Sequence, residues 1–117
     1  MKKVLIIDDE KRILDIYLRI LSPAGVAVRG ASNAQTATGI LVSENIDLVL
    51  LDIKMPVIDG KTMFEIIEEY DPDIKVIVSS VYPIERQKQL VPRAEDYYDK
   101  AEGPSKLLEK VKHMLAA

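Results

Sequence analysis

One apolar run constrains the fold of this chain more than any other feature of its sequence. Residues 48–51 are Leu, Val, Leu and Leu, and Asp52 ends the run abruptly. A strand without alternation of apolar and polar residues is typical of a parallel sheet that is covered on both faces. In open α/β sheets ligands bind beyond the carboxyl ends of the strands, which is where Asp52 would lie.

The rest of the chain alternates short apolar runs with helical patterns. Strands are predicted at residues 4–7, 26–28, 47–51, 74–78 and 96–99. Helices are predicted at 11–21, 31–41 and 61–70, with a short or irregular one within 83–92 and a last one that begins at Gly103-Pro104. Five strand–helix repeats predict a doubly wound (βα)5 parallel sheet with helices on both faces. The first and third strands would border its switch point.

Length and composition exclude several function classes. A chain of 117 residues is predicted to form one domain, residues 1–117. It contains no cysteine, so disulfides, thiolate metal sites and a cysteine nucleophile are excluded. The net charge is −3 and no basic stripe is present, which argues against direct nucleic-acid binding. No stretch is long and apolar enough to insert into a membrane, so a cytoplasmic location is expected.

Five polar side chains follow the predicted strands directly: Asp8, Asp9, Asp52, Ser80 and Lys100. Because all strands of a parallel sheet point the same way, these side chains would meet at one edge. Crowded carboxylates repel one another, and a hard cation such as Mg²⁺ relieves that repulsion through oxygen ligands.

The same set of residues suits phosphoryl transfer. A carboxylate can attack phosphorus and form an aspartyl phosphate. The oxygens of the moving phosphoryl group then need positive charge and hydrogen-bond donors around them, which a cation, Lys100 and Ser80 would supply. The sequence therefore predicts that one of the aspartates accepts a phosphoryl group.

The chain resembles the receiver domain of two-component response regulators. The residues that carry this resemblance are Ile6-Ile7-Asp8-Asp9, Leu51-Asp52-Ile53-Lys54-Met55-Pro56 with Gly60, Ser80, and Tyr97-Tyr98-Asp99-Lys100. The resemblance covers essentially the whole chain and implies a flavodoxin-like sandwich with strand order 2-1-3-4-5.

The resemblance also implies roles for individual residues. Asp52 would be the phosphoacceptor. Asp9, Asp52 and the backbone carbonyl of Lys54 would bind Mg²⁺ or Mn²⁺, and Asp8 would act largely through water.

Other roles implied by the resemblance concern the transferred group and the response to it. Ser80 and Lys100 would contact the phosphoryl oxygens, and Tyr97 would be the aromatic residue whose position changes on activation. The donor would be a histidine kinase or a histidine-containing phosphotransfer protein, and the recipient of the signal a downstream protein or a fused output domain. The domain would assist its own phosphorylation and dephosphorylation without being an enzyme in the ordinary sense.

Five positions depart from the pattern of that family: Val57, Ser80, Val81, Arg93 and Ala101. Ser80 replaces the commoner threonine but keeps a hydroxyl group. Val81 stands where a small residue is usual, and its bulk would restrict access to Asp52. Lys100 is followed by Ala101 rather than proline. A cis bond before a non-proline residue costs about 3–4 kcal/mol, so we predict a trans bond and a rearranged loop after Lys100.

Simpler interpretations stay open for each residue alone. Asp8 and Asp9 would also suit the positive end of the following helix dipole. Ser79 is an alternative to Ser80, and Tyr97 could be an ordinary core aromatic residue.

Other functions are also weighed against the receiver hypothesis. A receiver-like interaction module that works without phosphorylation is the main alternative. A hydrolase with an aspartate nucleophile would need a second acid two residues further on and a cap domain. A dinucleotide site lacks its glycine-rich loop.

Overall fold

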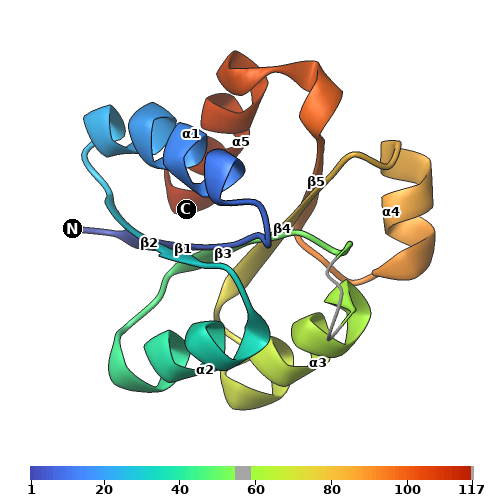
Figure 1. Cartoon of the computed structure of the whole chain (residues 1–117), viewed down its shortest axis with the longest axis horizontal. Helices are drawn as coiled ribbons and strands as arrows, with labels where there is room; N and C mark the ends of the chain where they lie inside the picture. Colours follow the sequence, from blue (N-terminus) through green and yellow to red (C-terminus); the bar gives the residue numbers. More distant parts are fainter. Residues whose placement is uncertain (55–58, 117) are drawn as a thin grey trace.

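A parallel sheet lies between two layers of helices in the computed structural model, which describes residues 1–54 and 59–116 (Figure 1). The strands are β1 Lys3–Ile7, β2 Ala27–Ala31, β3 Leu48–Leu51, β4 Lys75–Ser80 and β5 Asp96–Asp99. The helices are α1 Lys11–Leu21, α2 Ala34–Ser43, α3 Gly60–Tyr70, α4 Ile84–Leu90 and α5 Pro104–Ala116. The strand order is β2-β1-β3-β4-β5 and every pairing is parallel, which confirms the predicted fold.

The apolar run at the centre of the sequence becomes the central strand, β3. All four of its residues are buried. Leu48 and Leu50 pack on the face covered by α1 and α5, whereas Val49 and Leu51 pack on the face covered by α2 and α3 (Figure 1). Each large apolar side chain buried in this way contributes about 1.5–3 kcal/mol. The run shows no alternation because both faces of the strand are covered.

The boundary between β2 and α2 differs from the prediction. Ala31 was expected to begin a helix, but it is the buried last residue of β2. The helix α2 begins at Ala34, because the side chain of Asn33 accepts a hydrogen bond from the Thr36 amide at 2.8 Å and caps it. Ala31 has a high helix propensity, but strand pairing outweighs it.

Two further comparisons with the prediction concern α3 and α4. The helical pattern predicts that Tyr70 lies on the buried face of α3. In the structure Tyr70 is the last residue of that helix, and it is 51% exposed. The second concerns α4: of the two alternatives predicted for residues 83–92, a short helix or an irregular one, the structure contains the short helix, Ile84–Leu90. Met55 and Pro56, on which part of the family resemblance rests, lie outside the described residues, and so does Val57, which departs from the family pattern.

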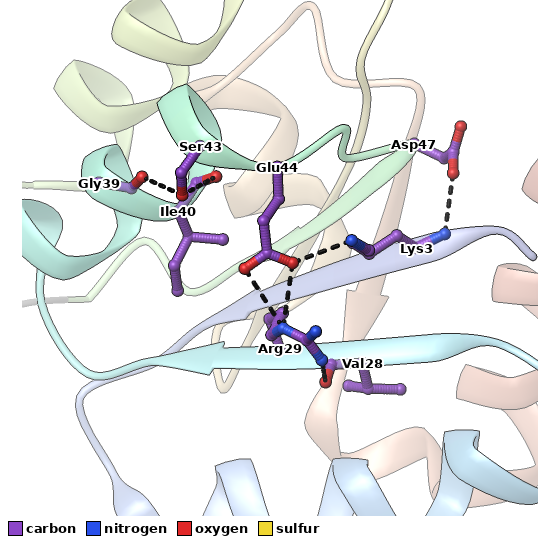
Figure 2. A network of polar contacts seen from close by, with 8 residues as sticks. All are labelled: Lys3, Val28, Arg29, Gly39, Ile40, Ser43, Glu44 and Asp47. Carbon is purple, nitrogen blue, oxygen red and sulfur yellow. Dashed lines mark hydrogen bonds and ion pairs between the residues drawn. The ribbon is translucent and has the colours of Figure 1, made fainter.

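A polar network around Glu44 and Asp47 lies at the start of β1, the opposite end of that strand from Asp8 (Figure 2). Lys3 Nζ lies 2.9 Å from Glu44 Oε1, and Arg29 Nε lies 3.1 Å from the same oxygen. The backbone N–H of Lys3 donates to Asp47 Oδ2 at 2.8 Å. The hydrogen bond from Lys3, together with the charge of Arg29, lowers the pKa of Glu44. The network therefore joins β1, β2 and the end of α2.

Gly60, the first residue of α3, lies close to the backbone of Ile53, which follows Asp52. A Cβ atom on Gly60 would lie 2.2 Å from Ile53 Cα, which is a backbone atom that no rotamer change can move. The Gly60 N–H donates to the Ile53 carbonyl at 3.3 Å. The start of α3 is thus held against the segment that follows Asp52.

This contact predicts opposite effects of alanine at two glycines. We expect Gly60→Ala to lower the free energy of unfolding by about 2 kcal/mol or more, because the backbone must shift. A Cβ atom on Gly39, inside α2, would have no neighbouring atom within 4 Å, so Gly39→Ala should raise stability by about 0.5–1 kcal/mol through helix propensity. Urea denaturation of both variants measures this. Equal stabilities for the two variants would contradict the contact.

Candidate functional site

The site lies where β1 and β3 end, at the point where the chain leaves neighbouring strands for opposite faces of the sheet (Figure 1). Asp8 follows β1 and Asp52 follows β3. The Asp8 N–H donates to the Ala31 carbonyl at 3.0 Å, and the Asp52 N–H donates to the Ile7 carbonyl at 2.9 Å. These bonds extend the sheet by one residue and hold both carboxylates at its edge, as predicted.

Three carboxylates converge at this edge. Asp8, Asp9 and Asp52 each offer an oxygen, and these oxygens all lie within 4.8 Å of one another. Asp8 is 1% exposed and Asp52 is 5% exposed, whereas Asp9 is exposed to solvent. Two acids are therefore removed from water beside a third, which is costly unless positive charge is close.

Lys100 supplies positive charge from the far end of the sheet. It follows β5, and its Nζ lies 2.7 Å from Asp8 Oδ2 and 3.9 Å from Asp52 Oδ2. The lysine side chain is itself largely buried. One ammonium faces three carboxylates, so the described part of the site retains an excess of negative charge.

Backbone amides hold the other oxygens of the two buried acids. The Glu10 N–H donates to Asp8 Oδ1 at 3.0 Å, and the Lys54 N–H donates to Asp52 Oδ1 at 3.1 Å. With Lys100 on Oδ2, both oxygens of Asp8 are already engaged. Asp52 keeps Oδ2 turned toward Lys100 at the longer distance. A role for the Lys54 carbonyl stays a prediction.

Burial dominates the protonation of Asp52. Loss of hydration, with a smaller contribution from the charges of Asp8 and Asp9, raises the pKa of Asp52 from 3.8 to about 6. The Lys54 N–H and Lys100 oppose this shift but do not cancel it. The surroundings of Asp52 thus favour the protonated carboxyl group, or a positively charged ligand that neutralises the carboxylate.

The donor set fits a hard divalent cation. The converging ligand atoms are carboxylate oxygens, which Mg²⁺ and Mn²⁺ accept readily. Their mutual repulsion gives a cation a favourable environment. Asp9 and Asp52 would hold it, and Asp8, whose oxygens are occupied by Lys100 and the Glu10 amide, would contribute through water.

The two candidate serines of β4 face different surroundings. Ser79 forms a 2.9 Å hydroxyl–hydroxyl hydrogen bond with Tyr17 of α1. Ser80 is fully buried at the end of β4, and its Oγ accepts a hydrogen bond from the Tyr82 N–H at 3.2 Å. Successive strand residues point to opposite faces, so only one of the two can turn toward the site. Ser79 is engaged by α1, which leaves Ser80 as the candidate.

Tyr97 is buried beneath α4 rather than turned to solvent. Its ring is 7% exposed, and its hydroxyl donates to the Val91 carbonyl at the end of α4. Burial raises the pKa of the Tyr97 hydroxyl. The predicted movement of Tyr97 would break this bond.

Two of the positions that depart from the family pattern, Val81 and Arg93, differ in their contacts. Val81 is 58% exposed. Arg93 lies 2.6 Å from Glu68 and over the ring of Phe64, so it joins the loop after α4 to α3. The two contacts of Arg93 thus join segments that lie more than 20 residues apart in the sequence.

The peptide bond after Lys100 is trans, as predicted, since the described residues contain no cis peptide bond. The loop forms a 3-10 turn over Lys100–Glu102. Asp99 Oδ1 accepts from the Ala101 N–H at 2.9 Å, while Glu102 Oε1 accepts from the Asp99 N–H at 3.0 Å. This reciprocal capping holds the turn without proline.

Sequence reasoning missed one buried polar residue near the site. Gln87 of α4 is completely buried, although its segment reads as a polar run. The available signal was its spacing, three residues after Ile84 and four before Val91, which places it on the inner face of the helix.

Comparisons with known proteins agree with this geometry. A family model described as the response regulator receiver domain matches residues 4–112. A protein-glutamate methylesterase/protein-glutamine glutaminase from Paramagnetospirillum magneticum is 39% identical over 80 residues, which are 67% of this chain and 21% of that protein. The probable transcriptional regulator ycf27 of Cyanidium caldarium is 32% identical over 113 residues, or 96% of this chain and 45% of that protein. The chain spans less than half the length of these relatives.

One solved relative has been captured in two complexes. The response regulator protein TrrA of Thermotoga maritima, in complex with Mg²⁺–BeF, is 33% identical and covers 97% of this chain and 99% of its own, with a TM-score of 0.88. In complex with the histidine kinase ThkA it is 34% identical and covers 98% of this chain and 99% of its own, with a TM-score of 0.88.

In the described part of the present chain, no helix has the length and apolar character needed to cross a bilayer. The expected cytoplasmic location stays a prediction.

The raised pKa of Asp52 predicts how stability depends on pH when metal is chelated. Because the folded-state pKa is about 6 and the ordinary value is 3.8, the folded protein loses stability as pH rises through that interval. Asn keeps the shape of the protonated carboxyl group without this loss. We therefore expect Asp52→Asn to be more stable than the parent at pH 7.5 by on the order of 2 kcal/mol, with the difference vanishing near pH 4.

Urea denaturation in EDTA at both pH values measures the effect. Asp15→Asn, which changes an exposed carboxylate on α1, is the control and should show no such pH-dependent gain. An Asp52→Asn protein no more stable than the parent at pH 7.5 would contradict the burial cost.

Proposed function

The chain belongs to the family of response regulator receiver domains, and from this membership we propose that Asp52 accepts a phosphoryl group from a phosphohistidine. An oxygen of Asp52 attacks phosphorus, the P–N bond to the donor imidazole breaks, and the bonding electrons leave with the imidazole nitrogen. The product is an aspartyl phosphate, a covalent intermediate open to later hydrolysis. The donor is a histidine kinase or a histidine-containing phosphotransfer protein.

One observation supports this proposal above all others. The Asp52 carboxylate lies among two further carboxylates and one ammonium, with its Oδ2 turned toward Lys100 at 3.9 Å. A lone buried carboxylate would suit a structural hydrogen bond, but this cluster concentrates the groups that phosphoryl transfer needs.

The acidic residues have a second task in this proposal. Asp9 and Asp52, with the Lys54 carbonyl, hold Mg²⁺, and Asp8 acts through water while positioning Lys100. The cation supplies charge neutralisation for the phosphoryl oxygens and screens the acids from one another. The same residues then assist loss of the phosphoryl group, so the domain resets itself.

Lys100 and Ser80 respond to the new charge. The Lys100 ammonium turns from Asp8 toward a phosphoryl oxygen, and the Ser80 hydroxyl donates to another. Movement of Ser80 frees space next to β5 and shifts Tyr97 between two positions, which changes the partner-binding surface of α4, β5 and α5. The hydrogen bond of Tyr97 to the Val91 carbonyl describes one of these two positions.

The partners follow from the relatives. TrrA, which has been solved with a histidine kinase, covers nearly the whole of this chain. The curated relatives are longer than the matched region, so a fused output domain or a separate downstream protein receives the signal. Direct contact with nucleic acid is not part of the proposal, since the chain carries a net charge of −3 without a basic stripe.

The acceptor is tested by labelling the protein with a small acyl phosphate and Mg²⁺. We expect intact mass spectrometry to show one added phosphoryl group in the parent and none in Asp52→Asn. Chelation of Mg²⁺ should abolish the gain, because the acids then repel the donor. No gain in the parent, under conditions that label a known receiver, would favour the interaction module that works without phosphorylation.

The metal is tested separately by thermal unfolding. Mg²⁺ at ten times its dissociation constant should stabilise the parent by about 1.4 kcal/mol, because it binds only the folded state. Asp9→Asn should lose most of this gain, whereas Asp15→Asn should keep it. Equal gains in the parent and Asp9→Asn would remove Asp9 from the metal site.

Lys100→Met tests the ammonium. Loss of the positive charge should slow phosphorylation by acyl phosphate at least tenfold while Mg²⁺ still binds, because the charge of Lys100 would be used in the transition state. The rate is followed by mass spectrometry against time, and Lys106→Met on the exposed face of α5 is the control.

A further inference from the structure

Gln87 is the most unusual residue outside the acidic cluster. It lies in the middle of α4 with no exposed surface, and a glutamine is seldom completely buried in a helix so polar. Its neighbours in the sequence, Arg86 and Lys88, are exposed. A buried amide must find hydrogen-bond partners or destabilise the fold.

The amide of Gln87 joins two segments that are far apart in the sequence. Its Nε2 donates to the Tyr82 carbonyl at 2.7 Å and to the Tyr98 carbonyl at 3.0 Å. Both partners are carbonyl oxygens, so only the NH₂ end of the amide can face them. The side chain therefore connects α4 to the segment after β4 on one side and to β5 on the other.

Ser80 is attached to the same segment. The Tyr82 N–H donates to Ser80 Oγ at 3.2 Å, and the Tyr82 carbonyl accepts from Gln87. One residue, Tyr82, thus carries both contacts on its backbone. A continuous series of hydrogen bonds runs from the Ser80 hydroxyl through Tyr82 and Gln87 to Tyr98, next to Tyr97.

The side-chain carbonyl of Gln87, unlike its NH₂ group, lacks a hydrogen-bond partner in the described part of the chain. Its Oε1 is buried and, among the described residues, has no hydrogen-bond partner. A buried acceptor without a partner costs free energy, so any arrangement of α4 that pairs this oxygen gains by comparison. The observed arrangement is therefore held by two hydrogen bonds from the Gln87 NH₂ group and opposed by one unpaired acceptor.

We propose that Gln87 is a positioning residue that couples the Ser80 hydroxyl to the placement of α4 and β5. The proposal rests on the proposed function, in which Ser80 turns toward a phosphoryl group on Asp52. In doing so, Ser80 alters its hydrogen bond with the Tyr82 N–H, and the backbone of Tyr82 moves, including the following peptide group that carries its carbonyl. Because Gln87 holds the carbonyl of Tyr82, the movement passes to α4 and to Tyr98.

The first test uses the unchanged chain. Nuclear magnetic resonance follows the side-chain amide signals of Gln87 and Gln89 with Mg²⁺ alone and then with Mg²⁺ and beryllofluoride, a phosphoryl analogue. We expect the Gln87 amide signals to shift on addition of beryllofluoride and those of Gln89, exposed on the same helix, to stay in place. Unchanged Gln87 signals with shifted Ser80 backbone signals would overturn the coupling.

The second test compares Gln87→Met with its matched control, Gln89→Met. Methionine keeps the length of the side chain and the helix propensity but removes the amide. In the parent, beryllofluoride should change hydrogen exchange of residues 84–90 by about fivefold or more, the usual range of a coupling between sites. In Gln87→Met this ratio should approach one while beryllofluoride still binds, and in Gln89→Met it should equal that of the parent.

The outcomes separate the two proposals. If Gln87→Met speeds exchange equally with and without beryllofluoride, so that the ratio of the parent is kept, Gln87 is merely structural and the coupling is wrong. If beryllofluoride leaves the Ser80 signals of the parent unchanged, the proposed function is wrong and the coupling falls with it. Should Gln87→Met fail to fold, the amide signals of the parent decide the question alone.

Discussion

Repulsion among carboxylates at one edge of the sheet is the constraint on which the rest of this structure depends. Asp8, Asp9 and Asp52 place oxygens within 4.8 Å of one another, and two of these side chains are almost fully buried. Such a cluster is stable only with positive charge beside it. Lys100 supplies one charge, but burial, together with the neighbouring charges of Asp8 and Asp9, still raises the pKa of Asp52. The site is therefore prepared for a cation and for a change of charge on Asp52.

The parallel sheet is what allows these groups to meet. Asp8, Asp52 and Lys100 follow three different strands. Asp8 and Lys100 are in contact although 92 positions separate them in the sequence. Parallel strands joined by helices all end at one edge, so each loop contributes one group to a common site. The contact between Gly60 and Ile53 then keeps the segment after Asp52 close to α3.

On the other side of the site, hydrogen bonds rather than charges connect the elements. Ser80 contacts the Tyr82 amide, Gln87 holds the Tyr82 and Tyr98 carbonyls, and Tyr97 holds the Val91 carbonyl. These bonds place α4 relative to β5 through a few backbone groups. A small displacement of Ser80 would therefore reach α4 without rearrangement of the apolar core, which packs too densely to deform gradually.

The sequence by itself determined the strands, their parallel arrangement and the acidic cluster, because these depend on local periodicity and on residues that directly follow apolar runs. The trans bond after Lys100 also followed from local chemistry. The tertiary structure alone decided which serine remains available, since Ser79 is engaged by Tyr17, 62 residues away. It likewise decided that Ala31 pairs in a strand and that Gln87 is buried. Partners of this kind lie far apart in the chain, and hydrogen bonds between distant segments leave no periodic trace in the sequence.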